Sequence, residues 1–140
     1  HLFVSAATAP DIAALDPIAH LPYDGFLDGL RRMGGTPEEL LGDPEIMELV
    51  APTLRNDLAL HESYRVLDGV RAPCGITTFA ATADPRVPLD TARRWESFSG
   101  GSFRFLTLDA GHFFLAEATP MLVGEIASDL ARVSGGPLSA

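Results

Sequence analysis

Three short stretches of the chain have the apolar character of strands. Leu2–Ser5 is a brief apolar run that stops before Pro10. Residues 76–82 are small, β-branched or aromatic and carry no charge, and residues 103–108 form a third run. Strands of a parallel sheet are covered on both faces, so their sequences are nearly continuous in apolar residues. The pattern therefore predicts three strands, and the first two of them are expected to be buried.

Helical spacing fills the interval between the first two strands. Residues 24–33 form an amphipathic segment that ends at Gly34-Gly35, where glycine supplies the left-handed stop. Thr36 opens a capping-box sequence, with Pro37 at the first helical position and Glu39 three residues after Thr36. A second short helix is therefore expected to start with Thr36 as its N-cap.

A longer helix is expected to begin at Asp43-Pro44, which repeats the start signal. Apolar residues then recur three and four positions apart, at Ile46, Leu49, Val50, Leu54 and Leu58. Pro52 stands inside this pattern and is expected to kink the helix or split it in two. Residues 24–66 are thus predicted to be a helical block.

Two further helices are predicted after the second and third strands. Residues 88–98 fit one helix that stops at Gly100-Gly101, and Thr119-Pro120 starts the last one. Strands that alternate with helices imply right-handed crossovers and a parallel sheet. The predicted fold class is therefore α/β, with chemistry expected beyond the carboxyl ends of the strands.

Composition narrows the possible functions. The chain has 140 residues, of which 46% are hydrophobic and 21% charged, the balance of one folded domain. Ten basic against nineteen acidic residues give a net charge of -9, which argues against nucleic-acid binding. No apolar run approaches the roughly 18 to 20 residues that cross a bilayer. We therefore expect neither a nucleic-acid nor a membrane partner.

Two features bear on the cell compartment and on the start of the sequence. Cys74 is the single cysteine and cannot form an internal disulfide, so a cytoplasmic location is expected. The sequence opens on His1 followed by an apolar run, without an initiator Met or a leader of signal-peptide form. We expect the native protein to begin upstream of His1.

Asp84 and His112 are the candidate catalytic residues. Asp84 follows the second predicted strand and His112 follows the third, so both are expected on one rim of the sheet. A hydrolase uses an imidazole as base and a carboxylate to hold its tautomer. In α/β-hydrolases the chain order is nucleophile, acid, histidine. Taken singly, Asp84 before Pro85 could be only a turn residue, and His112 could mark only a strand-to-helix turn.

The nucleophile that should precede this pair is absent from the sequence. A nucleophile elbow needs Gly-Xaa-Ser-Xaa-Gly between a strand and a helix, and neither Ser5 nor Ser99 has that setting. Cys74 lies at the start of its predicted strand, away from the catalytic rim. This sequence therefore offers an acid and a base without a nucleophile.

Several segments together resemble the type II thioesterases of polyketide and nonribosomal peptide synthesis. The matching segments are Leu2–Ala6 with Ala9-Pro10, Met33–Leu41, Pro52–Asp57, Tyr64, Ala83–Pro88 and Gly111-His112-Phe113-Phe114-Leu115. Asn56 departs from the small residue expected within the lid motif. The resemblance covers essentially the whole chain and places residues 1–140 in the carboxyl-terminal part of one α/β-hydrolase domain. It implies a helical lid inserted at about residues 20–68.

The resemblance also implies a function. Asp84 would be the triad acid and His112 the triad base, and the missing amino-terminal half of the hydrolase would supply the serine. The enzyme would hydrolyse acyl thioesters from the phosphopantetheine arm of acyl or peptidyl carrier proteins, with no cofactor. Two alternatives stay open: a general α/β-hydrolase esterase, and a non-catalytic fragment or interaction module.

Other candidate residues have a structural explanation as well as a functional one. Phe26, Leu30, Leu54 and Leu58 are candidates for lining an acyl pocket, although core or lid packing is the simpler interpretation for each. Phe113 and Phe114 are expected to pack beneath the histidine turn. The arginines Arg31, Arg32, Arg55, Arg93 and Arg94 could meet a carrier protein, but a solvated face accounts for most of them. His20 and His61 have no spacing that would build a metal site.

Overall fold

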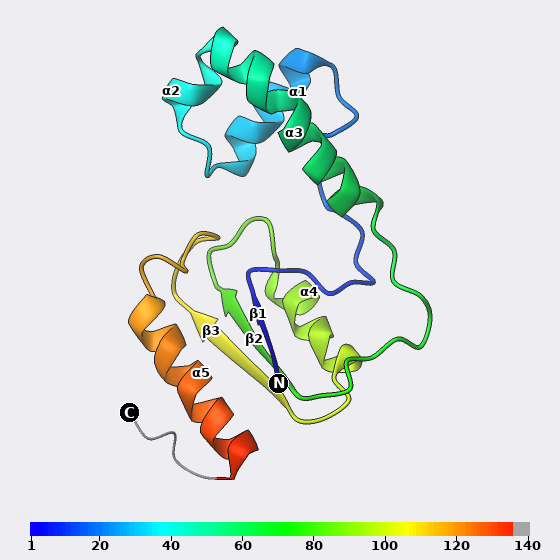
Figure 1. The fold of residues 1–140 in the computed structure, drawn as a ribbon, viewed down its shortest axis with the longest axis vertical. Coiled ribbons are helices and arrows are strands. Elements are labelled where there is room, and N and C mark those ends of the chain that lie inside the picture. The colour runs from blue at the N-terminus through cyan, green and yellow to red at the C-terminus, as the bar shows by residue number, and fades with distance from the viewer. Residues whose placement is uncertain (136–140) are drawn as a thin grey trace. The chain divides into compact units, whose positions relative to one another are not determined.

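The computed structural model describes residues 1–135 and shows a parallel sheet of three strands in the order β1-β2-β3 (Figure 1). The strands are β1 (Leu2–Ser5), β2 (Ile76–Ala81) and β3 (Phe103–Leu108). Leu2 pairs with Ile76, and Ile76 pairs with Phe103, so the three strands start level with one another. The predicted strands and their parallel pairing are confirmed.

Burial separates the central strand from its neighbours. Every residue of β2 is buried, as predicted for a strand covered on both faces. In β1, however, only Val4 is buried and Leu2 is 37% exposed. The prediction that residues 2–5 form a fully buried strand is wrong for the described chain, because β1 has a strand neighbour on one side alone.

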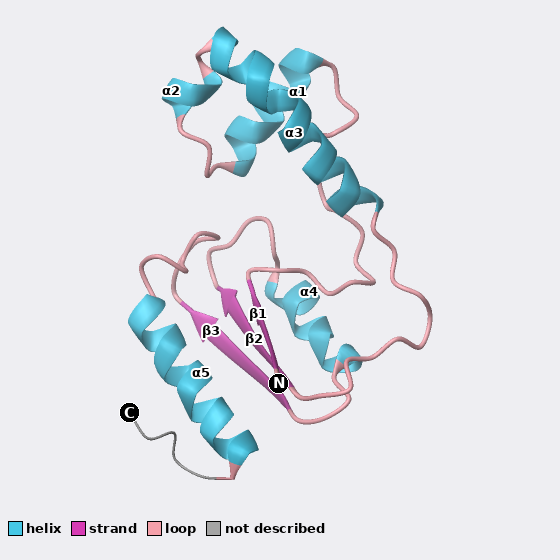
Figure 2. Cartoon of the chain, viewed as in Figure 1, coloured by secondary structure: helices cyan, strands magenta, loops and turns pink. Residues whose placement is uncertain are grey.

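Two helices cover opposite faces of the sheet (Figure 2). Helix α5 (Thr119–Ser134) packs its Leu122 against Phe79 and Ala81, whereas α4 (Leu89–Arg93) packs its Ala92 against Ala80. Successive strand residues point to opposite faces, so one strand supplies both contacts. Instead of one helix over 88–98, α4 stops at Arg93 and a 3₁₀ turn, η1 (Arg94–Phe98), follows.

Residues 10–66 form a compact unit of their own, inserted in the chain between β1 and β2. Its helices are α1 (Tyr23–Met33), α2 (Glu38–Leu41) and α3 (Pro44–Ser63). Their apolar faces enclose a separate core of Ile18, Phe26, Leu30, Leu41, Met47 and Ala51. This helical unit therefore has its own hydrophobic centre, distinct from that of the sheet.

Of the two predicted N-terminal caps, the one of α3 is present and the one of α2 is not. Asp43 caps α3 as predicted, because its carboxylate accepts hydrogen bonds from the backbone N–H groups of Glu45 and Ile46 at 3.0 and 3.2 Å. The capping box at Thr36 is wrong: α2 begins at Glu38, its N-cap is Pro37, and no side chain caps it. Proline holds an extended conformation ahead of the helix and delays its start by one residue.

Helix α3 differs from its prediction in two ways. One helix runs through Pro52, so the predicted split is wrong, whereas a kink at Pro52 stays a prediction. Pro52 is exposed, so water can replace the backbone hydrogen bond that proline removes. In addition, its apolar residues divide between two faces. Leu54 and Leu58 pack against the core of the unit, whereas Ile46 is 37% and Leu49 is 79% exposed. The spacing of apolar residues three and four positions apart does not show which of them face the core and which face solvent.

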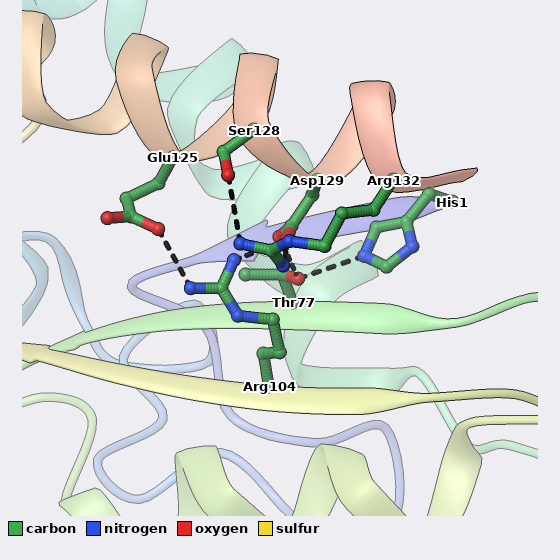
Figure 3. A network of polar contacts seen from close by, with 7 residues as sticks. All are labelled: His1, Thr77, Arg104, Glu125, Ser128, Asp129 and Arg132. Carbon is green, nitrogen blue, oxygen red and sulfur yellow. Dashed lines mark hydrogen bonds and ion pairs between the residues drawn. The ribbon is translucent and has the colours of Figure 1, made fainter. Parts of the chain in front are cut away.

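A buried polar network ties α5 to the sheet (Figure 3). The carboxylate of Asp129, only 2% exposed, accepts hydrogen bonds from Thr77 Oγ1 at 2.6 Å and from the guanidinium groups of Arg104 and Arg132. Burial alone would raise the pKa of Asp129, but the hydrogen bond from Thr77 and the two arginines hold it below its ordinary value. Arg104 also pairs with Glu125 at 2.8 Å.

Candidate active site

The ends of β2 and β3 are held together past the last paired residues of the strands. The backbone N–H of Thr82 donates to Leu108 O at 2.8 Å, and that of Ala83 donates to Ala110 O at 3.0 Å. Thr82 Oγ1 also donates to Asp109 Oδ1 at 3.1 Å. The two loops that carry Asp84 and His112 therefore leave the sheet side by side.

Asp84 and His112 meet directly on this rim. His112 Nδ1 lies 2.8 Å from Asp84 Oδ2, although the residues are 28 positions apart in sequence. The Asp84 side chain is 1% exposed and the His112 side chain 17% exposed. This distance agrees with the expectation that the strand ends bring an acid and a histidine together.

The surroundings of Asp84 fix which oxygen faces the imidazole. Asp84 Oδ1 accepts the backbone N–H groups of Arg86 at 2.8 Å and Val87 at 3.1 Å, within the turn that Pro85 begins. Only Oδ2 is then directed to His112. A carboxylate accepts hydrogen bonds and cannot donate them, so His112 Nδ1 must carry the proton. In the neutral ring Nε2 is left with a free lone pair, the state that a general base needs.

Ser5, Ser99 and Cys74 do not complete this pair. Ser99 Oγ donates to the carbonyl of Ser102 at 3.0 Å in the loop before β3, so it stabilises the amino-terminal side of the sheet. Cys74 precedes β2 on that same side. Ser5, at the end of β1, has a buried hydroxyl with no hydrogen-bond partner within residues 1–135. None of the three lies in a strand-to-helix elbow.

The two phenylalanines after His112 behave differently from each other. Phe114 is 1% exposed and packs with Phe79 and Leu122, as predicted. Phe113 is 54% exposed, and its ring stands edge-on to the His112 ring with centroids 4.9 Å apart. The prediction that Phe113 packs beneath the turn is wrong, because one buried neighbour already anchors the loop.

The candidate acyl-pocket residues belong to the helical unit. Phe26 and Leu30 are 0% and 4% exposed inside the core of that unit, and Leu54 and Leu58 are partly buried against it. Phe26 and Leu30 therefore have almost no free surface for an acyl chain in this arrangement of the helices. Acyl contact by Leu54 and Leu58 stays a prediction.

Most of the candidate carrier-contacting arginines have intramolecular roles. Arg31 pairs with Asp28 and Glu38, and Arg32 pairs with Asp16, on the surface of the helical unit. The guanidinium of Arg93 lies 4.3 Å from the centre of the Phe105 ring. These arginines therefore have partners within their own part of the chain.

Arg55 is a structural residue that sequence reasoning missed. Its guanidinium donates to the carbonyls of Ala19 and Leu21, the latter at 2.7 Å, and lies 4.2 Å from the centre of the Phe26 ring. The carboxylate of Glu62 accepts the backbone N–H of Ile18 at 2.7 Å. Both side chains come from α3, so they fix the loop that leads into α1.

Residues 1–135 offer neither a metal cluster nor a helix that could span a bilayer. Among residues 1–135, no three His, Cys, Asp or Glu side chains gather in a way that could hold a metal ion. No helix in this described part of the chain is both long and apolar enough to cross a bilayer. His20 and His61 are both exposed.

Comparison with known proteins identifies the family. The family model that describes the thioesterase domain matches residues 1–130 of this chain. The chain belongs to the thioesterase domain family. Thioesterase PikA5 of Streptomyces venezuelae is 31% identical over 97% of this chain and 48% of its own length. The predicted resemblance to thioesterases of polyketide and peptide synthesis is confirmed.

Solved structures agree with this assignment. The type II thioesterase BorB from the borrelidin biosynthetic cluster matches with a TM-score of 0.74 and 31% identity, over 91% of this chain and 52% of BorB. ClbQ from the colibactin NRPS/PKS pathway matches with a TM-score of 0.80 and 28% identity, over 95% of this chain and 57% of ClbQ. This thioesterase-family chain therefore spans about half the length of the relatives that it matches.

Proposed function

We propose that this chain supplies the acid, the base and the lid of a serine thioesterase that removes acyl groups from the phosphopantetheine arm of carrier proteins. The observation that carries the proposal is the Asp84–His112 contact of 2.8 Å on the rim of a thioesterase-family sheet. The nucleophilic serine comes from polypeptide outside these 140 residues. The helical unit of residues 10–66 serves as the lid.

The reaction has two acyl-transfer steps. In the first, the serine hydroxyl attacks the thioester carbonyl carbon while His112 Nε2 takes its proton. The C–S bond breaks, and the departing pantetheine sulfur receives that proton from His112. In the second step water attacks the acyl-serine ester, giving its proton to His112, which returns it to the serine oxygen. Asp84 holds the Nδ1 proton throughout and stabilises the imidazolium.

Carrier recognition must be local. These 140 residues carry a net charge of -9, which opposes long-range attraction to any carrier protein that is itself acidic. We therefore infer that this part of the enzyme recognises such a carrier through a local patch of residues. We place the reaction in the cytoplasm, a location that the single cysteine favours.

The test uses the complete protein that contains this chain, with acyl-loaded carrier protein and a simple oxygen ester as substrates. His112→Ala is expected to lower thioester hydrolysis by about 10³-fold or more, because the base is lost. His61→Ala is the matched control, since His61 is exposed on α3. Near-normal turnover by His112→Ala would contradict the proposal, and preference for the oxygen ester would favour a general esterase.

A covalent label locates the nucleophile independently. A fluorophosphonate probe is expected to modify a serine outside residues 1–140, and His112→Ala should slow this labelling. Modification of Ser5 or Ser99, or no labelling of a folded protein, would contradict the proposed division of the active site. The second result would favour a non-catalytic module.

A further inference from the structure

The loop after β3 is anchored by one phenylalanine and exposes the next. Phe114 is 1% exposed among Phe79 and Leu122, so it fixes the loop to the core beneath α5. The adjacent Phe113 keeps 54% of its surface in solvent. An apolar side chain contributes stability in proportion to the area removed from water, so Phe113 adds little to the core that the described residues form.

Phe113 has a specific neighbour. Its ring stands at 87° to the His112 ring, with the centroids 4.9 Å apart. This is the perpendicular arrangement that aromatic pairs favour. The exposed ring is therefore in contact with the one imidazole that faces a buried carboxylate in the described chain.

A single hydrogen bond leaves the imidazole of His112 incompletely fixed. The Cβ–Cγ bond and the hydrogen bond to Asp84 Oδ2 hold two points of the ring, which leaves tilting about the line between them. Such tilting moves Nε2, the atom that must reach the serine proton. A second non-covalent contact, away from Nδ1, opposes this tilting.

We propose that Phe113 is a positioning residue that supplies this second contact and keeps His112 Nε2 aimed at the serine. The proposal rests on the proposed role of His112 as general base. Phe113 acts through His112 and does not bind the acyl group. Its removal should therefore lower kcat and leave KM unchanged.

The test compares Phe113→Ala and Phe113→Tyr in the complete enzyme. Phe113→Ala is expected to lower kcat by about 3- to 10-fold, the range that an aromatic pair contributes, without a change in KM. Phe113→Tyr retains the ring and should restore kcat. Leu115→Ala is the control, because Leu115 is 53% exposed on the same turn. It should keep the wild-type kcat.

A spectroscopic measurement does not depend on turnover. The Nδ1 proton of His112, bonded to Asp84, should give a downfield NMR signal that is sharp in the parent protein and broadened in Phe113→Ala. A raised KM with an unchanged kcat would overturn the inference, since the ring would then bind substrate. Wild-type kcat together with a sharp signal would also overturn it. If His112→Ala remains active, the proposed function itself has failed.

Discussion

Replacing Asp129 by Asn tests the polar network that fastens α5 to the sheet. The substitution preserves the volume of a side chain that is 2% exposed and removes its charge. Thr77 can still donate to the amide oxygen of Asn, but Arg104 and Arg132 lose their anionic partner. With the amide oxygen facing Thr77, the amide NH2 takes the place of Oδ1, which accepts from both arginines. The change therefore removes the charge together with these two hydrogen bonds.

The structure sets the expected size of the effect. The pair with Arg132 is worth about 0–1 kcal/mol, because the Arg132 side chain is 56% exposed. Hydrogen bonds to a charged group contribute about 1.5–3 kcal/mol, but Arg104 keeps its contact with Glu125. We expect Asp129→Asn to lower the free energy of unfolding by about 2 kcal/mol at pH 7.

The effect should depend on pH. The pKa of Asp129 is lowered in the folded protein, so its charge stabilises the fold above the pKa of the unfolded chain, about 4. That contribution is lost as the pH falls through the lower, folded-state pKa. We expect urea unfolding of the complete protein, followed by circular dichroism, to test this. The free energies of unfolding of the parent protein and of Asp129→Asn should converge as the pH falls below about 4.

Two controls make the result decisive. Arg132→Ala removes the exposed partner and should cost no more than about 1 kcal/mol. Arg104→Met should cost more, because it leaves the buried carboxylate with fewer partners. The reasoning is refuted if Asp129→Asn is as stable as the parent at pH 7, or if their difference is the same at pH 7 and pH 3.

Three further changes are predicted. Asp43→Ala should lower the free energy of unfolding of the helical unit by about 1 kcal/mol in urea unfolding, because α3 loses its cap. Gly29→Ala should cost about 1–3 kcal/mol in the same assay, since the new Cβ would lie 2.7 Å from a methyl carbon of Ile18. Asp84→Asn should lower kcat by about 10⁴-fold with the fold intact, because an amide in place of the carboxylate favours the wrong tautomer of His112.

Matched controls accompany these changes. Gly124→Ala, in α5, has no atom within 4 Å of the new Cβ and should stabilise by about 0.5–1 kcal/mol. Equal costs at Gly29 and Gly124 would contradict the packing argument. Glu45→Ala, in the first turn of α3, should cost less than Asp43→Ala. An inactive Asp84→Asn variant with altered circular dichroism would not support the tautomer argument.

The pattern of hydrophobic and polar residues, together with their order along the chain, is enough to predict much of the fold and the Asp84–His112 pair. The continuous apolar run over residues 76–82 predicted β2, because a central strand buries both faces. Asp43 predicted the start of α3, because a cap acts on the next two or three residues. Parallel strands end on one rim, so Asp84 and His112 could be predicted to meet from their places after successive strands.

Tertiary packing decided what local pattern left open. Spacing of three and four places residues on a helix face but does not say which face is covered, so the outward position of Leu49 was missed. The sequence does not distinguish Phe113 from Phe114, because only the fold buries Phe114 and leaves Phe113 exposed. The partners of Asp129 lie 52 and 25 residues away, at Thr77 and Arg104. A buried charge needs partners from other elements, and only the folded chain selects them.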